Sequence, residues 1–256
     1  MCVAAFAWNA HPRWRLVLAG NRDEFHARPS APLARWPDAP GVYGGRDLAA
    51  GGTWLGVDAR GRCALVTNVR DPRAPQDGAS RGLLASDYLR GDRGALAHAA
   101  ALLPGAGGYR PFNLLLFDAV ACAWVSNRPA IIVRPADGVH VLSNAELDAP
   151  WPKAVALGAS LGGWLEEEPE DTGFHALFAA LADDAPWPDA QLPDTGIGLE
   201  RERWLSAAFI RGADYGTRAS TVIALDRAGG GIIVERRWGP QGVALGSTRL
   251  TLPAAA

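Results

Sequence analysis

The groups in this sequence best suited to chemistry are a cysteine at position 2 and a polar block further along. Cys2 directly follows the initiator methionine, and the block reads Asn21-Arg22-Asp23-Glu24. Removal of the methionine, which is favoured before a small residue, would leave an α-amino group with a pKa of about 7.7 to 8.0 beside the thiol. Such an amine can act as a general base near neutral pH, and a nearby arginine lowers the pKa of a thiol. These residues predict a cysteine nucleophile at a processed N-terminus.

Two short apolar runs are placed so that they bring these groups together. Residues 3–8 and 16–19 are apolar, and a polar turn at residues 9–13 separates them. In an antiparallel hairpin the start of the first strand faces the end of the second, so Cys2 lies beside Arg22 and Asp23. We expect Arg22 to stabilise the thiolate and Asp23 to accept a hydrogen bond from the α-ammonium group, as in an N-terminal-nucleophile (Ntn) hydrolase. The alternatives are a small buried cysteine that opens an edge strand and a local ion pair at a strand end.

Composition and charge describe a globular chain with no overall attraction to polyanions. The 256 residues (27.0 kDa) are 48% hydrophobic and carry a formal net charge of -2, which argues against nucleic acid or an anionic membrane as the partner. No stretch is typical of a secretion signal or a membrane span. The three cysteines are too few and odd in number for a disulfide scaffold, and Cys63 and Cys122 lie in apolar runs typical of a core. We therefore expect a cytoplasmic protein.

The basic residues are almost entirely of one type. Of the 25 lysines and arginines, Lys153 is the single lysine, and alanine, glycine and proline are abundant as well. This bias indicates a GC-rich genome rather than a function.

Local patterns follow one another as blocks of strands and blocks of helices. Ser80 and Thr172 are candidate N-caps, Gly91 is a candidate helix stop, and Gly51-Gly52 marks a bulge or a close approach of the backbone. The expected elements after the first hairpin are a surface loop at 28–45, a hairpin at 54–57 and 63–69, helices at 80–91 and 93–103, strands at 112–117, 122–126, 130–134 and 139–143, helices at 151–165 and 172–182, a loop at 186–198, a short helix at 200–210, and strands at 219–226, 231–238 and 243–250.

This order predicts an α+β fold in the form of a four-layer α/β/β/α sandwich. Neighbouring strands joined by short turns favour two antiparallel sheets, and the paired helices are suited to cover them. A doubly wound parallel fold needs regular alternation of strand and helix, which the sequence lacks. The even composition, without linker, charge block or internal repeat, predicts a single domain over residues 1–256.

The motifs of several other functional classes are missing from the sequence. There is no Gly-Lys phosphate loop and no G-x-G-x-x-G. The five histidines are scattered without metal-ligand spacing, and the cysteines form no C-x-x-C. We expect no metal site and no required cofactor.

A set of short motifs extends over nearly the whole chain. The segment AGNRDEF, with Cys2 upstream, resembles the NRDE family, which includes the transport and Golgi organisation protein 2 homologues. This family is in turn similar to the Ntn hydrolases of the penicillin V acylase and bile-salt hydrolase type. The resemblance continues in GGRD (44–47), GGTWLG (51–56), LVTNVRDP (65–72), SRGLL (80–84), LSNAELDAPWPKA (142–154) and YGTRASTV (215–222).

The resemblance implies an Ntn-hydrolase-like fold and further site residues. Those hydrolases combine an N-terminal cysteine with an arginine and an aspartate on the second strand, which the predicted hairpin matches. Their oxyanion hole uses an asparagine side chain and a backbone N–H group, which correspond here to the side chain of Asn144 and the N–H of Asn68. Arg218 matches a late arginine near the nucleophile. Taken singly, each asparagine also fits a turn, and Arg218 also fits a simple ion pair.

Two functions from different classes follow from these observations. The first is a cysteine amidohydrolase acting on a small N-acyl substrate, with Arg46, Trp54 and Arg218 lining a pocket for the acyl group or an anionic end. The second, implied by the eukaryotic members of the family, is a non-catalytic carrier of haem or of a lipid or acyl-CoA ligand in the same cleft. No C-x-x-C-H motif is present, so haem would bind non-covalently through His, Cys or Tyr. The sequence predicts neither the oligomeric state nor the choice between these ligands.

Overall fold

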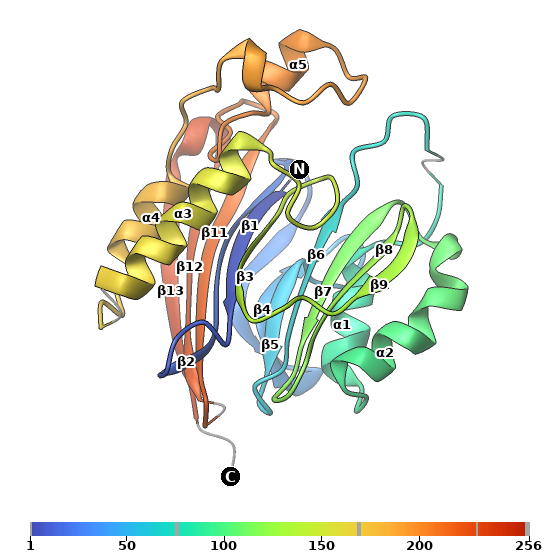
Figure 1. Ribbon diagram of the computed structural model, residues 1–256, viewed down its shortest axis with the longest axis vertical. Coiled ribbons are helices and arrows are strands. Elements are labelled where there is room, and N and C mark those ends of the chain that lie inside the picture. Colours follow the sequence, from blue (N-terminus) through green and yellow to red (C-terminus); the bar gives the residue numbers. More distant parts are fainter. Residues whose placement is uncertain (1, 75–76, 168–169, 229, 254–256) are drawn as a thin grey trace.

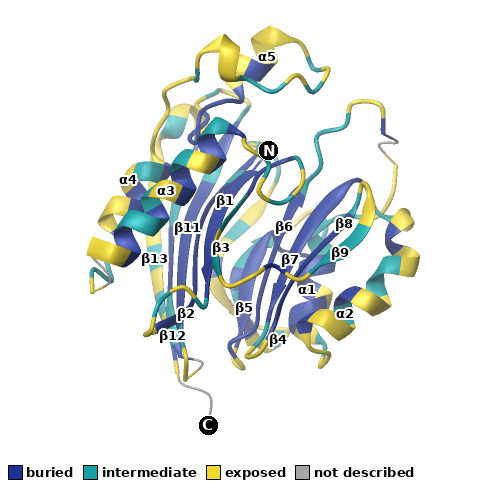
Figure 2. Cartoon of the chain, viewed as in Figure 1, coloured by how far each residue is buried: buried dark blue, intermediate teal, exposed yellow. Residues whose placement is uncertain are grey.

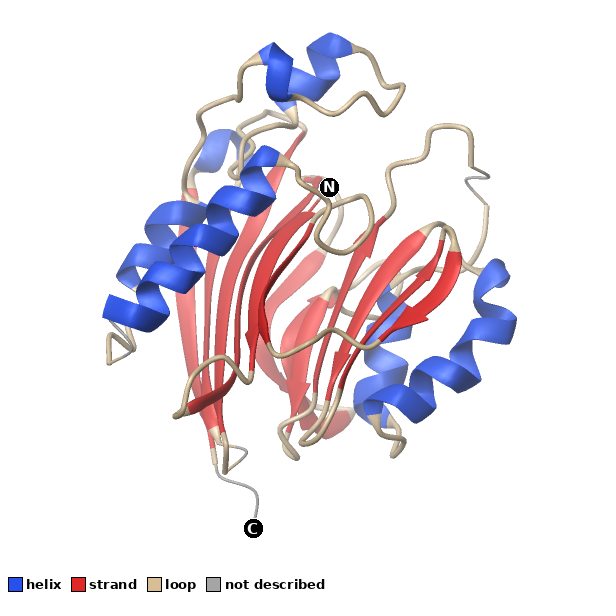
Figure 3. Ribbon diagram, viewed as in Figure 1, coloured by secondary structure: helices blue, strands red, loops and turns tan. Residues whose placement is uncertain are grey.

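The fold consists of two antiparallel sheets that face one another, with helices on both outer faces. The computed structural model describes residues 2–74, 77–167, 170–228 and 230–253, and Met1 lies outside the described residues. Figures 1 and 3 show the four layers in the order helix, sheet, sheet, helix. The predicted α+β sandwich is therefore confirmed.

The six-stranded sheet contains the predicted N-terminal hairpin. In this sheet Cys2 lies directly opposite Arg22, so the start of the first strand does face the end of the second. Its order is β10-β1-β2-β11-β12-β13, with bounds β1 Cys2–Trp8, β2 Trp14–Phe25, β10 Gly138–Leu142, β11 Tyr215–Asp226, β12 Gly231–Trp238 and β13 Ala244–Leu252.

The seven-stranded sheet includes a segment that we expected to be a surface loop. The prediction of a loop at 28–45 is wrong, because this segment forms β3 and β4. Pro32 is tolerated in β3 because β3 is an edge strand, and the buried Leu33 and Trp36 anchor it. The sheet has the order β3-β4-β5-β6-β7-β8-β9, with bounds β3 Ser30–Trp36, β4 Ala39–Asp47, β5 Leu55–Asp58, β6 Cys63–Asn68, β7 Phe112–Phe117, β8 Cys122–Asn127 and β9 Ala130–Val133.

Of the five α-helices in the described residues, two cover each sheet and the last lies beyond the end of the six-stranded sheet (Figure 1). Helices α1 and α2 pack on the seven-stranded sheet, and α3 and α4 pack on the six-stranded sheet. Among the described residues, no helix has both the length and the apolar composition needed to cross a bilayer. The bounds are α1 Gly82–Arg90, α2 Ala95–Leu102, α3 Pro152–Glu167, α4 His175–Leu181 and α5 Leu199–Trp204, with short 3-10 helices at Leu103–Gly108, Asp189–Gln191 and Pro240–Gly242.

Three predictions about helix ends are wrong. The N-cap position of α1 is Arg81 rather than Ser80, and no side chain caps it. The backbone N–H groups of Gly173 and His175 donate to the Asp171 carboxylate. Asp171 therefore has the capping role that we expected for Thr172. The helix expected at 200–210 ends at Trp204. The predicted stop of α1 at Gly91 is confirmed.

The core has three apolar layers, which Figure 2 shows as buried strands and inward helix faces. Alternation along β1 sends Cys2 and Phe6 into the layer between the sheets, and Val3 and Ala5 into the layer under α3 and α4. Cys63 and Cys122 lie fully buried between the sheets, as expected for core cysteines.

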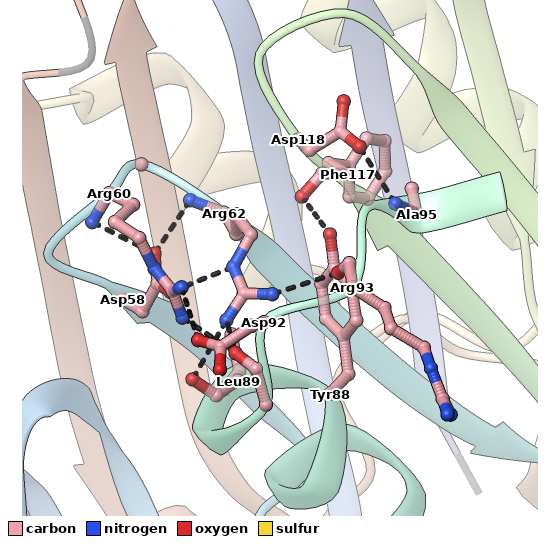
Figure 4. Close-up of polar contacts among 12 residues, drawn as sticks. Asp58, Arg60, Arg62, Tyr88, Leu89, Asp92, Arg93, Ala95, Phe117 and Asp118 are labelled. Atoms are coloured by element: carbon pink, nitrogen blue, oxygen red, sulfur yellow. Dashed lines mark hydrogen bonds and ion pairs between the residues drawn. The ribbon is translucent and has the colours of Figure 1, made fainter. Parts of the chain in front are cut away.

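A buried arginine fixes α1 to the β5–β6 hairpin (Figure 4). The Arg62 Nε donates to Asp58 Oδ2 at 2.8 Å, and their side chains are only 7% and 3% exposed. The other Arg62 nitrogens donate to the main-chain oxygens of Gly91 and Arg93, just beyond the helix. The Tyr88 hydroxyl donates to a main-chain oxygen at the end of β7. These bonds hold the C-terminal end of α1 and so determine where its N-terminal end lies.

The expected close approach at Gly51-Gly52 occurs at its second residue. A Cβ atom on Gly52 would lie 2.3 Å from the carbonyl carbon of Gly82, which leaves no space for a side chain. The backbone N–H of Thr53 donates to the Gly82 oxygen at 3.1 Å. The start of α1 is therefore packed directly against the chain that precedes β5.

Candidate active site

A cavity of about 630 Å³ opens beside the start of β1. It brings together five of the residues that the sequence singled out. Its walls come from both sheets and from the start of α1, so the sandwich itself forms the site. The five residues are Cys2, Arg22, Asp23, Trp54 and Asn68.

The register of β1 and β2 explains how Cys2 and Arg22 meet. The two residues are paired across the hairpin, so their side chains leave the sheet on the same face. Asp23 is the next residue, and alternation directs its side chain toward the other face, where Thr217 Oγ1 donates to its Oδ1 at 2.7 Å. Asp23 nevertheless touches the nucleophile through its backbone N–H, which donates to the Cys2 sulfur. Arg22 and Asp23 thus act on Cys2 in different ways.

The thiol is nearly inaccessible to solvent, and this controls its acidity. Cys2 is 7% exposed, and burial raises the pKa of its thiol. The Asp23 carboxylate raises this pKa further, whereas the Arg22 guanidinium and the hydrogen bond from the Asp23 N–H lower it. In the described conformation burial outweighs the groups that favour a thiolate.

The Asp23 carboxyl is buried as well. Burial raises its pKa, while Lys153, Thr217 and Arg22 lower it. An aspartate that stays ionised at this depth needs these groups, since an isolated buried carboxylate is strongly disfavoured. Thr217 and Lys153 therefore belong to the site, although the sequence analysis assigned neither of them.

Asn144 and Asn68 are adjacent, as the resemblance implied, but only Asn68 lines the cavity. The Asn144 Nδ2 donates to the main-chain oxygen and to Oδ1 of Asn68, at 2.9 and 3.0 Å. The preceding Ser143 donates from its hydroxyl to the Cys2 carbonyl at 2.8 Å. In this conformation Asn144 positions Asn68 beside the nucleophile and directs no donor of its own into the cavity.

Arg46 and Arg218 line a second, smaller cavity of about 80 Å³, and Trp54 lies between the two cavities. Arg46 pairs with Asp38 at 2.6 Å and stacks on an indole ring. The Arg218 guanidinium donates to the main-chain oxygens of Phe25 and Arg28 and to a serine hydroxyl. Neither arginine lines the cavity that holds Cys2.

Comparison with known proteins shows the family to which the chain belongs. The family described as Transport and Golgi organisation 2 matches residues 1–240. The chain belongs to this family. Its relatives include the Bos taurus Transport and Golgi organization protein 2 homolog, 34% identical over 264 residues and 92% of each chain. The Drosophila melanogaster Transport and Golgi organization protein 2 is 35% identical over 254 residues and 88% of each chain.

Two solved structures share the fold of this family member. The Caenorhabditis elegans N-acylethanolamine-hydrolyzing acid amidase (NAAA) ortholog aligns with a TM-score of 0.52 at 10% identity, over 87% of this chain and 92% of that one. A mutant of the conjugated bile acid hydrolase from Clostridium perfringens aligns with a TM-score of 0.55 at 6% identity, over 98% and 92%. The Ntn-hydrolase-like fold that the resemblance implied is confirmed.

The first residue of the family's NRDE motif has a structural role in this chain. Asn21 is fully buried, and its Nδ2 donates to the main-chain oxygens of Leu181 and Ala208, both at 2.8 Å. These bonds fix the end of α4 and the segment before β11 to β2. Asn21 therefore holds the strand that carries Arg22 and Asp23.

Replacing Asn21 with alanine is expected to lower the free energy of unfolding by about 2 to 4 kcal/mol, because two buried carbonyl groups lose their donor. Urea denaturation of the variant and the unaltered protein measures the difference. Gln191→Ala, which changes an exposed side chain, serves as the control and should leave stability nearly unchanged. Equal stability of all three proteins would contradict the structural role of Asn21.

Lys153 is the residue near the nucleophile that the sequence analysis missed. It lies near the start of α3, is 3% exposed, and its Nζ donates to the main-chain oxygen of Leu205 at 2.8 Å. Burial lowers its pKa to about 8, while Asp23 and Cys2 favour its charged form. The signal was present in the sequence, because Lys153 is the only lysine in an arginine-rich chain. We had attributed that composition to the genome.

The lowered pKa of Lys153 predicts a pH-dependent contribution to stability. Its pKa is about 8 in the folded chain and about 10.4 in an unfolded one. Between these values the unfolded chain binds more protons, so the free energy of unfolding rises with pH, by on the order of 3 kcal/mol in total. Lys153→Met removes this contribution. The difference in unfolding free energy between the unaltered protein and the variant should increase from pH 8 to pH 10, and a constant difference would contradict the assignment.

The cavity also contains charged residues to which the motifs gave no role. Arg28 pairs with Asp47 at 2.6 Å, while Arg81 donates to a main-chain oxygen at 3.1 Å. Arg110 is exposed at the rim. These side chains come from separate parts of the chain, so only the fold reveals that they share a cavity. Within the described residues, no group of three or more His, Cys, Asp or Glu side chains is arranged to hold a metal ion.

Proposed function

We propose that this chain is an Ntn-type cysteine amidohydrolase that cleaves the amide bond of a small N-acyl substrate. The observation that carries the proposal is the pairing of Cys2 with Arg22 at the wall of a cavity about 630 Å³ in volume. A cavity of this size is typical of small-molecule sites. The two proteins of similar fold support the assignment, since one is named as a hydrolase of N-acylethanolamines and the other as a hydrolase of conjugated bile acids.

The proposed reaction begins with removal of Met1, which frees the α-amino group of Cys2. This amine takes the thiol proton, and the thiolate then attacks the amide carbonyl carbon. When the tetrahedral intermediate collapses, the C–N bond breaks and the α-ammonium group protonates the leaving amine. Water, deprotonated by the same amine, hydrolyses the thioester and releases the acid. Processing also changes the surroundings of the sulfur, because an α-ammonium group favours the thiolate against the effect of burial.

Arg22, Asp23 and Asn68 have separate roles in this reaction. Arg22 stabilises the thiolate from the opposite strand, and the Asp23 carboxylate orients the α-amino group. The N–H of Asn68 stabilises the oxyanion, together with Asn144 if its amide turns from Asn68 toward the cavity. One such donor contributes about 2.7 to 4 kcal/mol to transition-state stabilisation.

The walls of the cavity suit a substrate with an apolar acyl group. Phe25, Trp54 and Val66 supply apolar surface beside Cys2. Phe25 is 58% exposed and its ring packs edge-on against Tyr215, so it marks the entrance. The three cysteines are free and buried, which fits a reducing compartment, and we take the cytoplasm as the location of the reaction.

Turnover of a panel of N-acyl amides by protein with verified removal of Met1 tests this function. The panel varies acyl length and the leaving amine, and amine release is measured. Hydrolysis of at least one member by the processed protein, and none by protein that retains Met1, is the expected result. No turnover of any member by fully processed protein would contradict the proposal.

A second candidate function is a non-catalytic carrier that uses the same cavity. The observation that favours it is the burial of Cys2, which raises the pKa of the thiol and disfavours a nucleophilic thiolate. The cargo would be haem or a lipid or acyl-CoA ligand. For haem, Cys2 and Tyr215 are the axial candidates among the described lining residues. Haem titration followed by absorbance separates the two functions, since tight binding without amide turnover supports the carrier.

A further inference from the structure

The smaller cavity is unusually rich in arginine for its size. Its volume is about 80 Å³, far smaller than that of the cavity beside Cys2. A space of this size is suited to an ion of a few heavy atoms. Among the described residues, three guanidinium groups that have no carboxylate closer than 3.8 Å line it: Arg22, Arg218 and Arg237.

Strand register places these side chains around a gap. Arg22, Ala219 and Arg237 lie in one row across β2, β11 and β12, so their side chains leave the sheet on the same face. Neighbouring strands are about 4.7 to 4.9 Å apart, which separates the backbones of the two arginines by roughly 9 to 10 Å. The methyl group of Ala219 fills little of the space between them. A β-bulge at Arg218, between Thr217 and Ala219, places the third guanidinium beside the gap.

The positive charge around this gap is poorly balanced. Within the described residues the Arg237 side chain makes no hydrogen bond or ion pair, and its buried Nε lacks a partner. The nearest carboxylate of Arg22 is Glu24, at 3.8 Å. Burial lowers the pKa of Arg218, and the like charge of Arg22 lowers it further. The like charges of Arg22 and Arg218 therefore repel one another at this partly buried site.

In the part of the chain that the structure describes, the carboxylates that line the cavity are Asp47 and Glu235, and neither makes a close contact with these arginines. Asp47 is bound by Arg28, which lies outside the smaller cavity. Glu235 is 4% exposed and accepts the backbone N–H of Leu33 at 2.8 Å. Burial raises the pKa of Glu235, which weakens its opposition to an added anion.

We propose that the smaller cavity is a binding site for a compact oxyanion, a phosphate or carboxylate group, held by Arg22, Arg218 and Arg237. Guanidinium groups bind such oxygens through short, charge-assisted hydrogen bonds, and the unpaired Nε of Arg237 supplies one donor. The site is distinct from the cavity that holds Cys2 and does not require that the chain be a hydrolase.

Arg22 links the two cavities. It faces Cys2 on β1 and Ala219 on β11, and it lines both spaces. An oxyanion over Ala219 competes with a Cys2 thiolate for the same guanidinium. Occupancy of the smaller cavity is therefore expected to slow alkylation of Cys2 by iodoacetamide at constant pH and ionic strength.

Calorimetric titration of the purified full chain with inorganic phosphate, and separately with acetate, tests the site. Arg237→Gln should weaken binding of whichever anion binds by about ten-fold or more. Arg236→Gln is the matched control, because its guanidinium lies on the other face of β12, over the Phe178 ring. Glu235→Gln should tighten binding, since it removes the opposing charge while keeping the acceptor for Leu33.

The proposal is supported if the unaltered protein binds an anion, Arg237→Gln binds it more weakly, and Arg236→Gln binds it equally well. The comparison of phosphate with acetate identifies the preferred oxyanion. The proposal is overturned if neither phosphate nor acetate binds. It is also overturned if Arg237→Gln binds the anion as tightly as the unaltered protein does. Thermal unfolding of each variant shows that the comparison is made on folded protein.

Discussion

Replacing Cys2 with serine is expected to lower kcat for amide hydrolysis by about a thousand-fold or more, because the attacking thiolate is lost. A serine hydroxyl is far less acidic than a thiol and is a weaker nucleophile at a site built for cysteine, even with the α-amino group as its general base. The fold should be retained, since the change exchanges one atom at a position that is 7% exposed. Amine release from the best substrate of the panel, measured beside thermal unfolding, tests both expectations.

Cys63→Ala is the matched control for this variant. Cys63 is fully buried between the sheets, and burial raises the pKa of its thiol well above the usual range. Its loss should affect stability through the small cavity that it leaves, but not kcat. Full activity of Cys2→Ser, or an inactive but folded Cys63→Ala, would contradict the assignment of the nucleophile.

Replacing Glu202 with alanine is expected to destabilise the protein by about 3 to 5 kcal/mol, because it removes one partner of a buried ion pair. The Arg70 and Glu202 side chains are 6% and 4% exposed and bond to one another. Thr195 donates to the same carboxylate from its backbone N–H, at 2.9 Å, and from its hydroxyl. This pair joins α5 and the loop before it to the end of β6. Denaturant unfolding measures the loss.

Glu200→Ala provides the control on the same helix, since Glu200 is exposed. Its replacement should change the free energy of unfolding by less than about 0.5 kcal/mol. Glu202→Gln keeps the shape of the side chain and an acceptor oxygen, so its free energy of unfolding should lie between those of Glu202→Ala and Glu200→Ala. A stability of Glu202→Ala equal to that of Glu200→Ala would show that the buried pair does not hold α5 in place.

The parts of the fold that were predictable from sequence are those set by local pattern. Apolar runs with clear turns located the hairpins at β1–β2 and β5–β6, and the antiparallel register then placed Cys2 opposite Arg22. The strands at β3 and β4 were missed because prolines made the segment resemble a loop. These strands are held in place because Leu33 and Trp36 are buried against distant elements. The local sequence does not indicate such contacts.

The candidate site was predictable only along the first hairpin and the recognised motifs. Arg46 and Arg218 follow the family pattern, yet they line a different cavity from Cys2, because a position in a motif does not specify which distant elements surround a side chain in the folded protein. Lys153 lies within the recognised motif at 142–154, but the motif gave it no role. It lies far along the chain, and only the packing of α3 on the six-stranded sheet brings it near Asp23.

The most direct test of the central claim is intact-mass spectrometry of the purified protein before and after mixing with an activated acyl ester. The account predicts a chain shorter than the full sequence by one methionine residue, which then gains a single acyl group that peptide mapping locates on Cys2. It also predicts that the adduct disappears with time as water hydrolyses the thioester. A chain that keeps Met1, or an acyl group found only on other residues, would contradict the account.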